Sequence, residues 1–153
     1  MRAHIYTAGT GKAVTHDDID ETASFATLVN VDAAEKVFLV GSEQEIDTEV
    51  TLRQVGVGET AHFVVHRCEN VNLHVGYTGR DLDEKAHVTT LVSKVLDKTA
   101  KHLGISDSDA ADLVFRISGT NDELDEAAPI GSYVANGTCS LVLDLVHLVR
   151  SAG

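Results

Sequence analysis

The end of the sequence, LVLDLVHLVRSAG at 141–153, holds the residues best suited to chemistry at a main-chain carboxylate. Arg150 is the last large side chain, and Ser151, Ala152 and Gly153 after it are small. A carboxylate that is activated and then attacked by an amine needs an unhindered approach, which glycine allows because it has no Cβ. Such an ending would suit a reaction at the carboxylate of Gly153, with Arg150 placed where an acidic pocket on an enzyme could bind it.

Other groups that resemble reactive or binding sites fail on type or spacing. The GTGK stretch at 9–12 lacks the upstream glycine and the Ser or Thr of a phosphate-binding loop, and it is typical of a hairpin turn. His62 and His66 lie roughly 13 Å apart along a strand, so they cannot share a metal ion. The carboxylates of 122–126 lack the glycine of a calcium loop, which favours a solvated acidic loop. We expect no metal, no cofactor and no enzymatic activity.

The two cysteines, Cys68 and Cys139, have no metal-type spacing and no evident base beside them in the sequence. A disulfide framework in so small a protein normally needs more of them. We therefore expect both to be reduced, buried and structural.

Charge and hydropathy exclude two classes of partner. Acidic residues outnumber basic ones 24 to 12, and no Lys/Arg cluster could follow a phosphate backbone, so nucleic acid is excluded. No stretch approaches the roughly 18 apolar residues of a membrane span. The first residues, MRAHIYTAGTGKAV, lack the apolar core of a signal peptide, which predicts a cytoplasmic location and no membrane partner.

Two stretches about 70 residues apart carry the same order of local signals. Each half opens with an alternating hairpin pattern, at 3–14 and at 71–82. A helix follows: 87–104 has a strong apolar stripe ending at Gly104, and 18–31 is a weaker match that Asp18 or Asp20 could cap. Each half then has two later strands, at 36–41 and 59–67 and again at 113–119 and 137–145.

This order predicts an α+β fold in which each half is a mixed sheet crossed by one helix. The expected bounds are 1–68 for the first domain, 72–148 for the second and 149–153 for a flexible tail. The linker CENV at 68–71 contains neither Pro nor Gly, so we expect closely coupled domains.

Both halves resemble ubiquitin in these segments. TGKAVT, KVFLVGSEQEI, TLRQVGV and TAHFVVHR follow one another in the first half, and LGI, DLVFRISG and TCSLVLDL repeat the order in the second. The chain is therefore similar to tandem β-grasp, ubiquitin-like modifiers, which include the interferon-induced modifier of vertebrates and the modifier of the bacterial Bil antiphage operons.

The resemblance implies a function for the tail. Gly153 would be conjugated to lysines of target proteins after activation by an ATP-using enzyme, with a conjugating enzyme and a deconjugating protease as further partners. Arg150, Ser151 and Ala152 would be the recognised tail. The chain departs from the family's Gly-Gly ending, since Ala152 precedes Gly153.

Alternation on the closing strand of the first half sends His62 and Val64 outward, and Phe38 points out on the neighbouring strand. The resemblance makes these three residues a partner-binding patch. The corresponding positions in the second half, Arg116, Ser140 and Val142, form a more polar set, so we expect patch-type binding in the first domain. Phe38 and Val64 could instead cover the other domain.

Three functions fit these observations: a covalent protein modifier acting in antiphage defence, a non-covalent tandem adaptor, and a sulfur carrier. Sulfur carriers are usually single domains, which disfavours the third. The first is the leading hypothesis.

Overall fold

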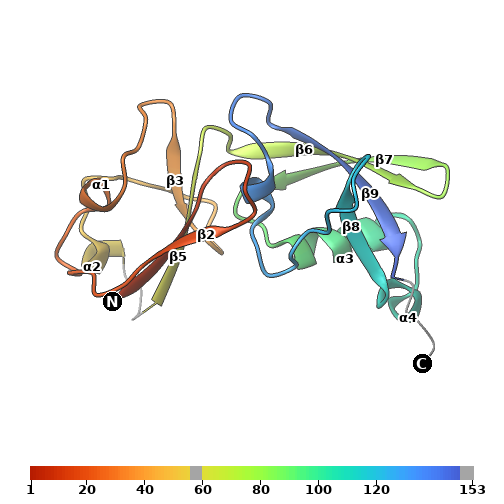
Figure 1. Ribbon diagram of the computed structural model, residues 1–153, viewed down its shortest axis with the longest axis horizontal. Coiled ribbons are helices and arrows are strands. Elements are labelled where there is room, and N and C mark those ends of the chain that lie inside the picture. Colours follow the sequence, from red (N-terminus) through yellow and green to blue (C-terminus); the bar gives the residue numbers. More distant parts are fainter. Residues whose placement is uncertain (56–59, 149–153) are drawn as a thin grey trace.

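The computed structural model describes residues 1–55 and 60–148. Figure 1 shows two lobes along the long axis of the molecule, each built around its own sheet. The N-terminus lies on the first lobe, and the last described residues lie at the outer end of the second. None of the helices in the two described ranges has the length and apolarity to cross a membrane.

The first lobe is a mixed sheet. Its strands are β1 (Arg2–Tyr6), β2 (Ala13–His16), β3 (Lys36–Leu39), β4 (Glu45–Ile46) and β5 (Thr60–His66). Within the described residues they lie in the order β2-β1-β5-β3-β4. β1 pairs antiparallel with β2, as the hairpin pattern predicts, and parallel with β5. The first and last strands of the lobe therefore lie side by side at its centre.

The second lobe repeats this arrangement. Its strands are β6 (Asn70–Tyr77), β7 (Arg80–His87), β8 (Leu113–Ile117) and β9 (Ser140–His147). In the described part of the chain their order is β7-β6-β9-β8, with β6 and β9 parallel at the centre. The two lobes thus confirm the predicted α+β class and the tandem β-grasp arrangement. The domain bounds 1–68 and 72–148 stay a prediction.

The helix predicted in the second half is present as α3 (Val92–His102). Its buried positions, which include Val92, Val95, Leu96 and Ala100, form the apolar stripe that the sequence shows. Gly104 has a φ of +73°, the left-handed conformation that commonly ends a helix. Two short helical segments, α4 (Asp107–Ala110) and η1 (Ile130–Tyr133), complete the lobe.

The helix predicted over 18–31 is wrong in its extent. Only α1 (Phe25–Leu28) is helical there, and α2 (Leu52–Val55) adds a second short segment. Asp18 has a left-handed φ of 55°, and the carboxylate of Asp20 accepts hydrogen bonds from the N–H and hydroxyl of Thr22. Aspartates that bind nearby backbone in this way form turns instead of helix. Neither aspartate caps α1.

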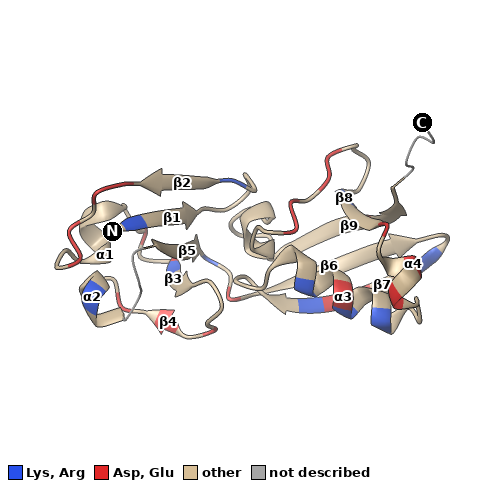
Figure 2. Ribbon diagram, turned by 90° about the horizontal axis from the view of Figure 1, so that it is seen from below, with Lys and Arg blue, Asp and Glu red and all other residues tan. Residues whose placement is uncertain are grey.

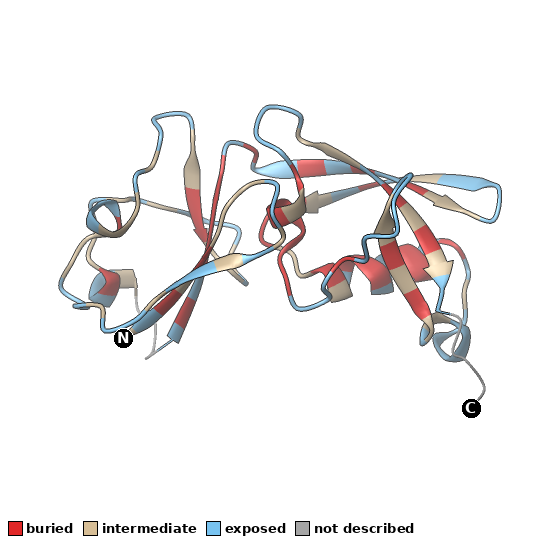
Figure 3. Cartoon of the chain, in the orientation of Figure 1, coloured by how far each residue is buried: buried red, intermediate tan, exposed pale blue. Residues whose placement is uncertain are grey.

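Each sheet buries one face in a core, and the second core also takes side chains from the first lobe. The first core combines the inner face of its sheet with α1 and α2: Ala3, Ile5, Phe25, Val37, Leu52, Ala61, Phe63 and Val65. The second lies between its sheet and α3, and Phe38 and Val64 of the first lobe belong to it. In Figure 3 the buried part of β5 leads into the junction between the lobes. The lobes are closely coupled, as the short linker predicts.

Candidate functional site at the last strand and the sheet faces

β9 carries the chain out of the second sheet from a central position. It pairs with β6 on one side and β8 on the other, so both of its edges are hydrogen-bonded. At its end the hydroxyl of Tyr77 lies 2.9 Å from Nε2 of His147, and the N–H of Leu148 donates to the carbonyl oxygen of Asp112 at 2.7 Å. The second domain therefore holds the chain up to residue 148.

The predicted conjugation residue Gly153 and the predicted tail residues Arg150, Ser151 and Ala152 lie outside the described residues. Their roles stay predictions. The structure gives the point from which they start. Leu148, which directly follows β9, is exposed, and β9 ends at the outer end of the second lobe, away from the first (Figure 1).

The predicted partner patch of Phe38, His62 and Val64 is wrong in its exposure. The register is right, because Phe38 pairs with Val64 and both face away from the first core. Both side chains are nevertheless 0% exposed. The second domain packs on this face, where the ring of Phe38 meets that of His87 edge-on with 4.6 Å between centroids. Alternation identifies a face of a sheet, and here the other domain covers that face.

His62 is the patch residue that stays exposed. Its ring stacks on that of His4 from β1, with centroids 4.8 Å apart, and Nδ1 of His4 lies 2.8 Å from the hydroxyl of Thr15. Partial burial, and secondarily the charge of His4, lower the pKa of His62. This end of the first sheet therefore presents two stacked imidazole rings, of which that of His62 has a lowered pKa.

The corresponding face of the second domain is open. Of Arg116, Ser140 and Val142, the valine is 53% exposed. It pairs with His74 on β6, whose Nδ1 lies 2.7 Å from the carboxylate of Asp83. The expectation that the apolar patch belongs to the first domain is therefore not supported at these positions, because Phe38 and Val64 are buried while Val142, on the domain that carries the tail, is exposed.

The last residue of β5 and the two residues after it each bind one point of the loop before β9. Nε2 of His66 donates to the carbonyl oxygen of Val134 at 2.7 Å, the N–H of Arg67 donates to Oδ1 of Asn136 at 3.1 Å, and Cys68 is disulfide-bonded to Cys139. We call these three contacts the linker clamp. They fix the path of the chain from one domain to the other.

The disulfide corrects the expectation that Cys68 and Cys139 are reduced. Their Cα atoms are 5.6 Å apart, the usual separation for a disulfide. The parallel pairing of β6 with β9 explains the proximity: Asn72 pairs with Ser140, and its N–H donates to the carbonyl oxygen of Cys139. Because β6 and β9 run side by side in the same direction, Cys68 and Cys139, which precede them, lie close together.

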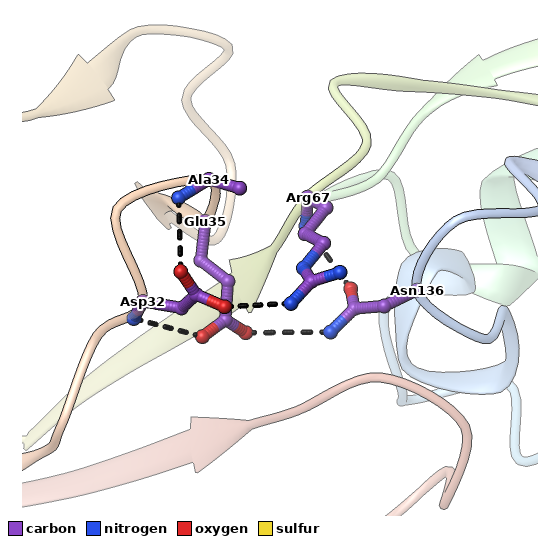
Figure 4. A network of polar contacts seen from close by, with 5 residues as sticks. All are labelled: Asp32, Ala34, Glu35, Arg67 and Asn136. Carbon is purple, nitrogen blue, oxygen red and sulfur yellow. Dashed lines mark hydrogen bonds and ion pairs between the residues drawn. The ribbon is translucent and has the colours of Figure 1, made fainter.

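A polar network surrounds the clamp at the surface (Figure 4). The guanidinium of Arg67 donates to the carboxylate of Asp32 at 2.6 Å, and the amide of Asn136 donates to Glu35 at 3.4 Å. The backbone N–H of Ala34, and then Arg67, lower the pKa of Asp32. Exposed ion pairs of this kind stabilise little, so the network mainly orients Arg67 and Asn136 toward each other.

The hairpin turn of the first domain also reaches the second. The N–H of Gly11 donates to the carbonyl oxygen of Ser132 at 2.9 Å. Gly11 has a φ of +69°, and a Cβ at this position would overlap the ring of Tyr133. The GTGK stretch is a hairpin turn, as predicted, and it is also a contact between the domains.

Two buried histidines lie at the junction, and burial lowers the pKa of each. Nδ1 of His66 accepts the N–H of Cys68 at 2.9 Å while its Nε2 donates to a carbonyl, so the ring is neutral. Nδ1 of His87 lies 2.8 Å from the hydroxyl of Thr89. Adding a proton to either ring would place a charge in an apolar interface.

The described residues contain no group of three or more His, Cys, Asp or Glu side chains that could hold a metal ion. The carboxylate-bearing residues of the predicted acidic loop are exposed, as expected: Asp122, Glu123, Asp125 and Glu126. Figure 2 shows charge of both signs on α3, where Lys94, Lys98 and Lys101 are exposed together with Asp97.

Sequence reasoning missed the clamp residues His66 and Asn136 and the contact of Gly11 with the second domain. The absence of Pro and Gly in the linker pointed to close coupling, but no local pattern identified the loop that the linker binds.

Comparison with known proteins identifies the second domain. The family model described as BilA ubiquitin-like domain 2 matches residues 72–148, which is half of the chain. A designed protein based on ubiquitin is similar at 17% identity and a TM-score of 0.43, over 56% of this chain and 96% of that one. A chain of a pParkin–pUb–UbcH7 complex has the same identity and TM-score over 52% of this chain and 23% of that one. No curated protein matches the sequence. By its family match the chain belongs to the BilA ubiquitin-like domain 2 family.

Proposed function

We propose that the chain is conjugated through the carboxylate of Gly153 to lysine amines of target proteins, in bacterial antiphage defence. The proposal rests on one observation: the domain matched by the family model ends just before a short tail of small residues. That domain ends at residue 148, β9 ends one residue before it, and the small residues Ser151, Ala152 and Gly153 follow.

The anchored end of β9 supports this function. Binding the tail in the narrow active site of an activating enzyme costs conformational entropy for every flexible residue that becomes ordered. A rigid starting point close to the tail keeps the number of such residues small. The hydrogen bond from Leu148 to Asp112 and the contact of His147 with Tyr77 supply such a point. Arg150 then lies two residues beyond the anchor and can be bound by an acidic pocket.

The partners follow from this chemistry. An activating enzyme that uses ATP forms the adenylate of Gly153 and transfers the acyl group to a thiol, and a conjugating enzyme passes it to a target lysine. A deconjugating protease would hydrolyse the isopeptide bond. We propose a cytoplasmic location, where these enzymes and ATP are available.

The test is a reaction of the chain with its activating and conjugating enzymes, ATP and a lysine-bearing target. Trypsin cleaves after Arg150, so a target lysine modified by this chain carries a Ser-Ala-Gly remnant that mass spectrometry identifies. Deleting Gly153, or changing it to Val, should abolish all modified lysines, including those that would carry the corresponding Ser-Ala or Ser-Ala-Val remnant.

Lys94→Arg is the matched control, because Lys94 is exposed on α3 and the chain acts as acyl donor, not acceptor. This variant should form adducts at the rate of the unchanged protein. Covalent, reductant-resistant adducts that persist after deletion of Gly153 would show that the donor lies elsewhere.

The open face around Val142 favours a second candidate, a non-covalent adaptor. An exposed valine beside polar side chains can contact a partner without any tail chemistry. Assays without ATP, or with Gly153 deleted, distinguish the two functions. An adaptor still binds its partner under these conditions, whereas a modifier forms no covalent product.

A further inference from the structure

A cavity of about 160 Å³ lies at the junction of the domains, between the outer edge of β7, the helix α3 and the loop that joins β3 to β4. Its lining includes Glu84, Lys85 and His87 from β7, Lys98 from α3 and Glu43 from the loop of the first domain. Pockets for drug-sized molecules usually measure roughly 300–1,000 Å³. This cavity therefore has room for a small ion or a single functional group.

The ring of His87 contributes a hydrogen-bond donor. The residue is 5% exposed, and burial lowers its pKa, so the ring is neutral at neutral pH. Nδ1 accepts the backbone N–H of Thr89 at 3.2 Å, which leaves the proton of the neutral ring on Nε2. Within the described residues Nε2 has no hydrogen-bond partner. A buried donor without an acceptor costs free energy, so such a group calls for an acceptor from outside the chain.

The outer edge of β7 adds a main-chain donor. Lys85 pairs with Asn72 on β6, but the N–H of Asn72 donates to Cys139 on the opposite side, so residues 72 and 85 form a non-hydrogen-bonded pair. In such a pair the N–H and C=O of each residue point away from the partner strand. The C=O of Lys85 accordingly accepts Nζ of Lys98 from α3 at 3.3 Å. The N–H of Lys85 therefore points to the same outer side of β7, which the cavity borders.

Lys98 supplies a positive charge in a fixed position. Besides the carbonyl oxygen of Lys85, its Nζ lies 3.7 Å from the carboxylate of Glu84. The side chain of Glu84 is 5% exposed and its carboxylate also contacts Nδ1 of His102, so Lys98 is not its sole partner. An ammonium group has three N–H donors, and these two contacts leave one of them for a further acceptor.

We propose that this cavity binds a small oxyanion, either a carboxylate or a phosphate group. Its donors are the ring N–H of His87, the main-chain N–H of Lys85 and the ammonium of Lys98. An oxyanion accepts several hydrogen bonds at once and binds charged donors most strongly, which matches this set. The site lies apart from the tail, and the proposal does not depend on conjugation through Gly153.

Glu43 opposes such an anion from the first domain. It is exposed on the loop between β3 and β4, and its charge raises the pKa of His87 against the larger effect of burial. A carboxylate at the cavity repels a bound anion. The variant Glu43→Gln should therefore bind the anion about threefold more tightly, the range expected for one exposed charge.

The experiment titrates the full chain with inorganic phosphate at constant ionic strength and at about pH 7.5, where an ordinary histidine is neutral. NMR follows the ring N–H of His87 and the amide N–H of Lys85. We expect both signals to follow one saturable curve, with a dissociation constant of about 1 mM or below. A parallel titration with acetate identifies the group that binds best: tighter binding of acetate indicates a carboxylate ligand, and tighter binding of phosphate indicates a phosphate-bearing one.

Lys98→Gln is the test variant and Lys101→Gln is its matched control. Both changes remove one exposed positive charge from α3, but Lys98 borders the cavity and Lys101 does not. We expect Lys98→Gln to weaken phosphate binding about tenfold, because it removes a charged donor. Lys101→Gln should change the dissociation constant by less than about twofold, since salt screens a distant surface charge.

Three results would overturn the proposal. Shifts that rise linearly with phosphate would show that no site saturates. Equal weakening by Lys98→Gln and Lys101→Gln would show general attraction to α3 instead of binding in the cavity. A saturable curve in which the ring N–H of His87 does not shift would show that this donor faces the neighbouring ring of Phe38 and not the anion.

Discussion

Nε2 of His66 lies 2.7 Å from the carbonyl oxygen of Val134, and this hydrogen bond ties the last residue of the first sheet to the second domain. Both groups are buried. The geometry requires the neutral ring, because Nδ1 already accepts the N–H of Cys68. The junction between the domains therefore depends on the protonation of a histidine.

The free energy of unfolding should fall as the pH is lowered from about 7.5 to about 5. Burial lowers the pKa of His66 below its ordinary value near 6.5, so at intermediate pH the unfolded chain binds a proton that the folded chain does not. The stability that the neutral ring provides is present above its ordinary pKa and is lost as the pH falls through it. Urea unfolding at several pH values measures the slope.

His66→Gln is the test variant, because its amide can donate to Val134 and accept from Cys68 without titrating. We expect the free energy of unfolding of this variant to depend less on pH. His87 and His62, whose pKa values burial also lowers, supply the slope that remains. If the free energy of unfolding of His66→Gln changes with pH as steeply as that of the unchanged protein, His66 contributes nothing to the pH dependence.

Gly11→Ala should destabilise the protein by about 2 kcal/mol, from a left-handed backbone and from overlap with Tyr133. Gly9→Ala is the matched control: its φ is also positive, at +90°, but nothing lies within 4 Å of the added Cβ. It should cost about 1 kcal/mol, the backbone term alone. Equal losses in urea unfolding would mean that the Tyr133 contact carries no energy.

Val64→Thr and Val142→Thr should differ although they occupy corresponding strands. The hydroxyl at position 64 is buried in the junction, where burying it costs about 1–3 kcal/mol, while position 142 is half exposed and should change stability by less than about 0.5 kcal/mol. Thermal or urea unfolding gives both values. If Val64→Thr is as well tolerated as Val142→Thr, the second domain does not cover this face in solution.

Removing the disulfide with Cys68→Ala and Cys139→Ala should lower the free energy of unfolding by about 4 kcal/mol. This is the chain-entropy value for a bridge that spans 71 residues. The reduced unchanged protein is the control, and it should lose a similar amount. An unchanged unfolding midpoint on reduction would contradict the prediction.

Local patterns in the sequence predict most of the fold. Alternation and Gly-rich turns identify both hairpins, and the apolar stripe ending at Gly104 identifies α3, because these signals depend on neighbours along the chain. The prediction over 18–31 failed where Asp20 binds the backbone of Thr22, since one side-chain hydrogen bond can decide between turn and helix.

The candidate site was less predictable because it depends on contacts between the halves. Alternation gives the direction of Phe38 and Val64 but not what lies beyond them. The bridge was hidden by its sequence separation. The parallel pairing of the first and last strands of a β-grasp domain nevertheless sets Asn72 opposite Ser140, so both cysteines lie within a few residues of the point where the two strands meet. Combining the two signals would have predicted it.

The disulfide also determines how the chain responds to a pulling force. Tension applied between the two ends passes from Cys68 to Cys139 through the bridge and bypasses residues 69–138, which enclose β6, β7, α3 and β8. A machine that unravels the oxidised chain can extend the first domain and β9, but it must thread the enclosed segment as a closed loop alongside them. The bridge thus makes residues 69–138 of the second domain inextensible by force until it is reduced.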